Sequence, residues 1–164
     1  MLKRHTNWVR CCAYSADGAT MLSGSSDKTL KLWSVTTGAC IRTFVGHGER
    51  VNARCFSPAD GNTFLSSSGD DALKLWDAAT GECRSTLTGH DDEVNGCAFS
   101  PIHGNLVLSC SDDNELKLWN AATRECTATL EGHCNEVFCC TISQDGTTIA
   151  SGDTSGQLKI WRRE

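Results

Sequence analysis

The chain has 164 residues, of which 39% are hydrophobic and 21% are charged, and its net charge is −5 at pH 7. This length fits one domain, and the acidic balance argues against a nucleic-acid-binding protein, because such proteins carry a basic surface for the phosphates. No apolar run approaches the roughly 18 residues of a membrane span, and the opening MLKRHTNW lacks the apolar stretch of a secretory signal. We therefore expect an intracellular protein, cytoplasmic or nuclear, with neither nucleic acid nor a membrane as its partner.

A tandem repeat is marked by tryptophans spaced 43, 43 and 42 residues apart, at Trp33, Trp76, Trp119 and Trp161. These tryptophans close nearly identical phrases, which read TLKLW, ALKLW, ELKLW and QLKIW. A unit of this length cannot bury its own apolar face, so the units must stack on one another to form a core. Function is therefore expected on the surface of the stack.

Each unit begins with a predicted strand that is rich in β-branched and aromatic residues. The first strands are expected over residues 9–14, 51–56, 94–99 and 137–142. After a glycine-containing turn, second strands are expected over residues 21–23, 64–66, 107–109 and 149–151. The third strand ends at the tryptophan, and the first three units continue into a fourth strand that ends at Phe44, Leu87 or Leu130. Because no segment has helical periodicity, we predict an all-β chain of four-stranded antiparallel units.

Further positions repeat with these strands. A glycine–histidine pair precedes three of the first strands, a serine lies ten residues before every tryptophan, and an aspartate lies six residues before the first three tryptophans. With these motifs the chain resembles the WD-repeat β-propeller family over essentially its whole length, although the Trp-Asp dipeptide itself is kept only at Trp76-Asp77. The resemblance implies a β-propeller of four-stranded antiparallel blades and a single WD-repeat domain over residues 1–164. The repeats are expected at approximately 5–46, 47–89, 90–132 and 133–164.

In that family, a histidine, a serine, an aspartate and the tryptophan form a hydrogen-bonded chain within each blade. An indole N–H, a hydroxyl, an imidazole and a carboxylate can satisfy one another in a dry interior. The fourth set is expected to lack its carboxylate, because Ser155 stands where the other units have aspartate. The resemblance gives the sets His5, Ser23, Asp27, Trp33; His47, Ser66, Asp70, Trp76; His90, Ser109, Asp113, Trp119; and His133, Ser151, Trp161.

A cluster of serine, histidine and aspartate also suggests a hydrolase triad, but its repetition argues against this. A catalytic nucleophile is needed once, at an exposed elbow beside an oxyanion hole, and no GxSxG motif is present. The sequence also lacks phosphate-binding GxxxxGK[ST], metal-binding HExxH and dinucleotide-binding GxGxxG motifs. We therefore predict no catalytic residues, no cofactor and no metal, and a protein that is not an enzyme.

Eleven cysteines invite a disulfide framework, but many occupy equivalent places in the repeat, as Cys40, Cys83 and Cys126 do. Equivalent positions on stacked sheets are about 10 Å apart, whereas a disulfide tolerates Cα separations of about 4.4–6.8 Å. Adjacent cysteines in a strand point to opposite faces, so Cys11 and Cys12 do not resemble a metal-binding CxxC pair. We expect small apolar residues in a reducing compartment.

The blade count is about four, with three complete blades and a fourth that stops after its third strand. Propellers avoid exposed edges by closing into a ring, and members of this family typically have about seven blades. The expected structure is therefore a partial propeller or half of a ring. Either the chain is a segment of a longer protein, or two copies complete an eight-bladed ring as a homodimer.

Two arginines depart from the repeat. Arg124 replaces the glycine of the equivalent turns, which costs about 1 kcal/mol if the site needs left-handed backbone geometry. Arg54 takes the place held by Cys12, Cys97 and Cys140. A charge at that inner position needs a partner or water, unless the strand slips locally.

Partner-binding residues are expected where the repeat varies, immediately before and after the first-strand valine. By analogy with the family, this loop face binds other proteins or peptides. Aromatic and arginine side chains are the usual anchors of interfaces, so Trp8, Arg50 and Phe138 lead this set, and the acidic run at 91–93 favours a basic peptide. The full set of candidates is Trp8, Arg10, Arg50, Asn52, Glu93, Asn95, Glu136 and Phe138.

These expectations favour a scaffold or interaction module that binds partner proteins or peptides through the loop face. The alternative is a sensor or autoinhibitory repeat domain of a larger signalling NTPase, similar to apoptosome proteins. A third hypothesis is an enzyme subunit that uses a cysteine or the acidic loops.

Overall fold

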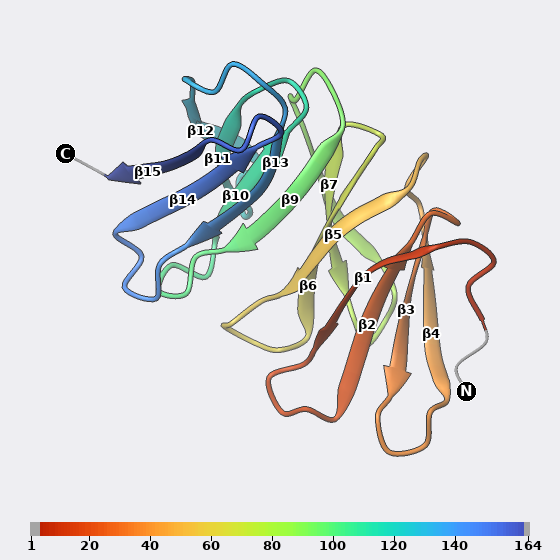
Figure 1. Ribbon diagram of the computed structural model, residues 1–164. Helices are drawn as coiled ribbons and strands as arrows, with labels where there is room; N and C mark the ends of the chain where they lie inside the picture. The colour runs from red at the N-terminus through yellow and green to blue at the C-terminus, as the bar shows by residue number, and fades with distance from the viewer. Residues whose placement is uncertain (1–3, 163–164) are drawn as a thin grey trace.

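The computed structural model describes residues 4–162, and this part of the chain forms fifteen β-strands without a helix. The strands make four antiparallel sheets, in which neighbours in sequence are neighbours in space (Figure 1). We call these sheets blades 1 to 4. Since residues 4–162 contain no helix, none of their segments is a helix long and apolar enough to cross a membrane.

The blades have the following strands. Blade 1 contains β1 (Val9–Tyr14), β2 (Thr20–Ser25), β3 (Thr29–Ser34) and β4 (Cys40–Val45). Blade 2 contains β5 (Val51–Phe56), β6 (Thr63–Ser68), β7 (Ala72–Asp77) and β8 (Cys83–Thr88). Blade 3 contains β9 (Val94–Phe99), β10 (Leu106–Ser111), β11 (Leu116–Asn120) and β12 (Glu125–Leu130). Blade 4 contains β13 (Val137–Ile142), β14 (Thr148–Asp153) and β15 (Leu158–Arg162).

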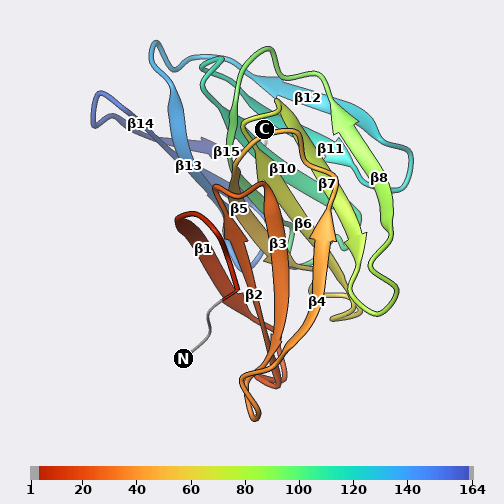
Figure 2. The ribbon, with the colours of Figure 1, turned by 90° about the vertical axis from the view of Figure 1, so that its right-hand side faces the viewer.

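The predicted fold is confirmed: the described chain is all-β, and its four-stranded antiparallel sheets are stacked like propeller blades without closing into a ring. The inner strands β1, β5 and β13 lie on the left in Figure 2, and the outer strands β4, β8 and β12 lie on the right. Blade 4 has only three strands in the described residues. Within residues 4–162, one edge of β15 therefore has no strand beside it.

The core lies between the blades and not within any one of them. Each blade has a leucine face, represented by Leu30 and Leu32 in blade 1, and a tryptophan face, represented by Val51, Phe64 and Trp76 in blade 2. The leucine face of blade 1 packs on the tryptophan face of blade 2, and the same arrangement joins blades 2 and 3 and blades 3 and 4. At every described interface, the leucine face of one blade therefore contacts the tryptophan face of the next.

Aromatic contacts make the first interface specific. Phe44 from β4 meets Phe64 edge to face, with the ring centroids 4.8 Å apart and the planes at 83°. It also meets Trp76 at 5.8 Å and 68°. The outer strand of one blade thus covers the tryptophan of the next blade.

The turn at Arg124 has left-handed backbone geometry, which is the condition under which arginine was expected to be unfavourable there. Arg124 has a φ of 68°, and the equivalent Gly38 and Gly81 have φ values of 69° and 86°. A side chain at this φ is strained, because its Cβ approaches the following carbonyl. Blade 3 therefore carries local strain that blades 1 and 2 avoid with glycine.

Candidate functional site: the hydrogen-bonded sets and the loop face

Each blade is pinned internally by one hydrogen-bonded set. In blade 2, the Trp76 indole donates to Ser66 Oγ at 2.8 Å, Ser66 Oγ lies 2.7 Å from His47 Nε2, and His47 Nδ1 lies 2.9 Å from Asp70 Oδ2. Because the serine hydroxyl can donate to Nε2, the Nδ1–H of a neutral imidazole is left to donate to the carboxylate. The set therefore connects the loop before β5 with β6, β7 and the turn between them.

The same connections recur in the other complete blades. The histidine Nδ1–carboxylate distance is 2.8 Å in blade 1 and 2.6 Å in blade 3. The structure brings together His5, Ser23, Asp27 and Trp33 in blade 1, and His90, Ser109, Asp113 and Trp119 in blade 3.

Blade 4 requires a correction, because its set does contain a carboxylate. His133 Nδ1 lies 2.7 Å from Asp153 Oδ2, and Ser151 Oγ joins His133 Nε2 at 2.8 Å and the Trp161 indole at 2.8 Å. Ser155, which stands where the other blades have aspartate, donates its hydroxyl to Asp153 Oδ1 at 2.6 Å. Compared with blades 1 to 3, the serine and the aspartate of this turn have exchanged positions. The contact between the carboxylate and the histidine is kept, although a fixed spacing from the tryptophan does not find this aspartate.

The positions in the other blades make this exchange clear. In blade 1, the Asp27 backbone N–H donates to the hydroxyl of Ser25, which occupies the place of Asp153. Asp27 in turn binds His5. In blade 4, the buried carboxylate occupies the serine position and reaches the histidine from there, with 1% of its side chain exposed.

Hydrogen bonds keep these carboxylates ionised. Burial opposes ionisation of Asp70, but donation from His47 and from the Gly48 N–H outweighs it and lowers its pKa to about 2. The hydroxyl of Ser155 is the main cause of the lowered pKa of Asp153, with His133 contributing against the cost of burial. In Asp27, the donors Thr29, Thr6 and His5 outweigh burial and hold the pKa well below its ordinary range.

These sets have the geometry of structural pins. In blades 2 and 3 the histidine side chains are completely buried, and the serine oxygen is bonded on both sides by the histidine and the tryptophan. A nucleophile would have to be reachable by a substrate. Because the hydrogen-bonded sets are buried in every blade, they are better suited to holding strands together than to catalysis.

The loop face gathers several predicted contact residues at the mouth of the inner strands. Arg10, Asn52, Asn95 and Phe138 follow the first-strand valine of blades 1, 2, 3 and 4. Together with Trp8 and Val9 they line one hollow of about 270 Å³. The side chains of Trp8 and Phe138 are 78% and 59% exposed. Five of the eight predicted contacts therefore surround a single feature.

The two asparagines of this group also have a structural task. Asn52 Nδ2 donates to the backbone carbonyl of Val94 at 3.1 Å, and Asn95 Nδ2 donates to that of Val137 at 3.2 Å. Each amide thus links its inner strand to the inner strand of the next blade by a hydrogen bond. Asn95 also donates to Asp112 Oδ1 at 2.5 Å, a partner that sequence reasoning did not single out.

The other three predicted contacts lie apart from the hollow. Arg50 pairs with Glu93 across blades 2 and 3 at 2.5 Å, with 43% and 24% of their side chains exposed. Glu136 accepts a hydrogen bond from the Thr154 hydroxyl at 3.3 Å. These contacts tie neighbouring loops together, so the structure does not place Arg50 as an unpaired anchor.

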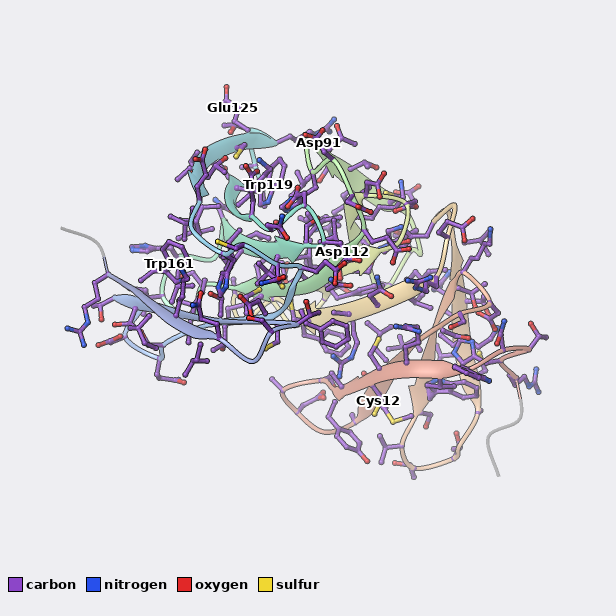
Figure 3. The ribbon with its side chains drawn as sticks, turned by 45° about the horizontal axis from the view of Figure 1, so that its top comes forward. Cys12, Asp91, Asp112, Trp119, Glu125 and Trp161 are labelled. Carbon is purple, nitrogen blue, oxygen red and sulfur yellow. The ribbon has the colours of Figure 1, made fainter. Side chains whose placement is uncertain are left out.

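An acidic surface lies on the loop face of blades 2 and 3. Burial raises the pKa of Asp71, and the negative charges of Asp92, Asp70, Asp113 and Asp91 raise it further. Figure 3 shows Asp91 and Asp112 on the loops of blade 3. Several negative charges therefore gather in this region.

A family comparison agrees with this geometry. The family described as "WD domain, G-beta repeat" matches residues 1–34, 38–77, 81–120 and 124–162, which is nearly the whole chain. The chain belongs to the WD-repeat family. Members of this WD-repeat family generally act as protein-interaction modules.

Individual WD-repeat relatives match shorter segments. WD repeat-containing protein 18 of Homo sapiens is 45% identical over 53 residues, which cover 32% of this chain and 12% of that protein. The probable E3 ubiquitin ligase complex SCF subunit sconB of Aspergillus clavatus is 41% identical over 51 residues, or 31% and 7%. The Lissencephaly-1 homolog of Branchiostoma floridae is 37% identical over 75 residues, or 35% and 18%. The matched segments are thus a small part of these relatives' length.

Buried thiols of this WD-repeat chain also meet across blade interfaces. All eleven cysteines are free. A hydrogen bond with Cys55 and burial raise the pKa of Cys97, and a hydrogen bond with Cys110 and burial do the same for Cys140. The raised pKa values favour the protonated, poorly nucleophilic thiol at Cys97 and Cys140. Within residues 4–162, no group of three or more His, Cys, Asp or Glu side chains is placed to hold a metal ion.

Arg54 keeps the register of the repeat. It pairs with Ser66 as Cys97 pairs with Ser109, so the strand does not slip at this residue. Its Nε is buried without a hydrogen-bond partner in the described residues. Burial raises the pKa of Cys11 in blade 1 to about 11 against the opposing effect of the nearby Arg54 charge. Arg54 therefore faces the first blade interface.

Proposed function

We propose that this chain binds segments of other proteins through the hollow at the mouth of its inner strands. The observation that carries the proposal is the pair of aromatic side chains, Trp8 and Phe138, exposed at the rim of one hollow. Exposed aromatic groups are unfavourable in water, and in interfaces they are frequent sources of binding energy. Trp8 lies just before β1 and Phe138 lies within β13, and in both blades the hydrogen-bonded set fixes the histidine segment that leads into the first strand.

The residues of the hollow take different roles in this proposal. Trp8 and Phe138 are the apolar anchors. The Arg10 side chain makes no hydrogen bond or ion pair within residues 4–162, so its guanidinium is free to meet a carboxylate or a backbone carbonyl of the partner. Asn52 and Asn95 hold the floor by stapling the strands.

The charges of the surface suggest the pattern of the bound segment. An apolar side chain would enter between Trp8 and Phe138, with an acidic residue toward Arg10. The acidic surface around Asp71 and Asp92 would favour basic residues farther along the segment. The proposal thus places an apolar anchor between charges of opposite sign.

A comparative capture experiment tests this proposal. The wild-type chain, a double variant with Trp8→Ala and Phe138→Ala, and a control with Ile102→Ala would be used as baits, with captured proteins quantified by mass spectrometry. Ile102 is 54% exposed and lies in the turn between β9 and β10, away from the mouth. For partners that depend on the hollow, the captured amount should fall at least tenfold with the double variant and stay unchanged with the control.

The same experiment can contradict the proposal. If the double variant is folded by circular dichroism and still captures every wild-type partner, the hollow is not the binding site. We further propose that the chain is intracellular and non-catalytic and works without nucleic acid or a membrane. The alternative of an autoinhibitory repeat domain of a signalling NTPase stays a prediction.

A further inference from the structure

The interface between blades 1 and 2 contains an arginine that reaches from one blade to the next. Arg42 in β4 donates from Nη1 to the Thr80 carbonyl at 2.8 Å and from Nη2 to the Ala79 carbonyl at 2.7 Å. Both carbonyls belong to the turn between β7 and β8 of blade 2. One planar guanidinium thus binds two successive backbone oxygens of the neighbouring blade.

The interface between blades 2 and 3 lacks this arginine. Ser85 in β8 occupies the register position that Arg42 has in β4. A hollow of about 310 Å³ lies beside Ser85, and its lining includes Leu75, Phe99 and Ala121. Blades 2 and 3 both have four strands and lie side by side in the stack, so this hollow is internal to the described chain.

The turn that borders the hollow repeats the turn that binds the arginine at the first interface. Residues 121–123 have the same Ala-Ala-Thr sequence as residues 78–80. Both turns close with the same backbone hydrogen bond, which is 2.8 Å long at the Gly81 N–H and 2.7 Å long at the Arg124 N–H. Blade 3 therefore offers the same pair of carbonyl acceptors as blade 2.

These two carbonyls are free in blade 3. Within residues 4–162, no hydrogen bond reaches the carbonyl of Ala122 or that of Thr123. Ala122 is exposed and lines the hollow. The second interface thus presents the acceptor pair and an open space in front of it, where the first interface has a guanidinium.

The charges at the hollow do not oppose a cation. Arg84 forms an ion pair with Asp77. Asp60 lines the hollow, and its carboxylate accepts a hydrogen bond from the Thr63 hydroxyl at 2.7 Å. Arg124 also lines the hollow, and its Nη2 lies 3.4 Å from the Arg84 carbonyl. Counted with Asp77, these side chains have no net charge, and the whole chain carries −5.

We propose that an arginine side chain of a partner protein occupies this hollow, with its guanidinium on the carbonyls of Ala122 and Thr123. The partner then supplies at the second interface the group that Arg42 supplies at the first. The methylene stem of that arginine would pack on Leu75 and Phe99. A lysine would fit less well, because its ammonium is a point charge and lacks the planar fork that matches two carbonyls.

This site is separate from the hollow at the mouth of the inner strands. The turns between β5 and β6, β9 and β10, and β11 and β12 border it. In antiparallel blades these turns lie at the end opposite the loops that precede the first strands. The site can therefore be tested independently of Trp8 and Phe138.

Two substitutions convert the second interface into a copy of the first. A Cβ added at Gly81 would lie 2.9 Å from Arg42 Cδ, so the internal arginine needs glycine beneath it. Ser85→Arg combined with Arg124→Gly supplies both residues and should fill the hollow from within. Arg124→Gly alone is the matched control, because it keeps Ser85 and leaves the hollow open.

A nuclear magnetic resonance titration measures occupancy of the hollow. The probe is N-acetyl-arginine amide, and the backbone N–H signals of residues 122–124 report its binding. Saturable shifts are expected for the wild-type chain and the control, with a dissociation constant on the order of 1 mM. N-acetyl-lysine amide should bind about tenfold more weakly, since one charge-assisted hydrogen bond is lost. The double variant should show no saturable shift and a higher urea midpoint.

Three results would overturn the proposal. One is a wild-type chain whose signals at residues 122–124 show no saturable shift with the arginine probe. Another is unchanged binding in the folded double variant, which would place the probe outside the hollow. The last is equal binding of the lysine probe, which would show attraction by charge alone. The first and last results need no substitution, so the test is decisive even if the double variant does not fold.

Discussion

Blade 2 and blade 4 have the same repeat but differ in their surroundings. Blade 2 lies between two neighbours, and its Leu73 and Trp76 are 0% and 1% exposed. Within the described residues, blade 4 has one neighbour and three strands, and Leu158 is 71% exposed while Trp161 is only partly buried. Figure 3 shows Trp161 at the end of the stack and Trp119 within it.

The hydrogen-bonded set is nevertheless closed in both blades. The distance from the tryptophan indole to the serine is 2.8 Å in blade 2 and in blade 4. The set is thus a property of one blade, whereas the apolar core belongs to pairs of blades. Polar pinning and apolar burial can therefore be disturbed separately.

The largest expected effect is on the buried core of blade 2. Leu73→Ala should lower the free energy of unfolding by about 2–5 kcal/mol, because a cavity replaces a completely buried side chain. Leu158→Ala should change it by less than about 0.5 kcal/mol in the single chain. Urea unfolding at low protein concentration measures both. Equal losses in the two variants would show that the open end contributes as much as the enclosed interface.

Exchanging the serine and aspartate of blade 4 tests whether its set is equivalent to that of blade 2. Asp153→Ser removes the acceptor of a buried histidine and should cost about 1–3 kcal/mol. Adding Ser155→Asp to this variant restores the order of blades 1 to 3 and should recover most of the loss. Ser155→Asp alone is the control, since it places two carboxylates in one turn. Urea unfolding of the two single variants and the double variant shows whether the second substitution restores stability or whether the two losses of stability simply add.

Spacing alone predicted most of this architecture but not the whole of it. Strand order, the three-stranded last blade and the positions of three hydrogen-bonded sets follow from the repeat, because each depends on periodic residues. Asp153 was missed because the expectation was tied to a distance of six residues from the tryptophan. The visible signal was the aspartate that lies two positions before Ser155 in the same turn.

The loop face shows a different limit of prediction from sequence. Variable positions after the valines indicated which residues lie at the mouth, since equivalent positions in stacked strands share one end. Sequence could not distinguish Asn52 and Asn95, whose amides reach the next inner strand, from the exposed Phe138. Such contacts between blades depend on how far one inner strand stands from the next, which no local pattern encodes.

Acid should weaken the pinned blades through their carboxylates. The pKa of Asp70 is about 2 in the folded chain, below its ordinary value of 3.8, so its contribution is present above pH 3.8 and is lost as the pH falls toward 2. The contribution is about 1 kcal/mol after allowance for its partial exposure to solvent. Asp70→Asn should lower the urea midpoint at pH 7 and flatten its decline between pH 4 and pH 2. An unchanged decline would assign the acid sensitivity to other groups.

The smallest effect is expected at the strained turn of blade 3. Arg124→Gly should relieve the left-handed strain at φ 68°, although the added freedom of glycine in the unfolded chain offsets part of the gain. The expected net increase is about 0.5 kcal/mol in the free energy of unfolding. Arg124→Ala is the control, because it removes the long side chain, whose Nη2 lies 3.4 Å from the Arg84 carbonyl, and keeps the strain. If alanine stabilised the chain as much as glycine, the cost at this turn would lie in the arginine side chain and not in the backbone.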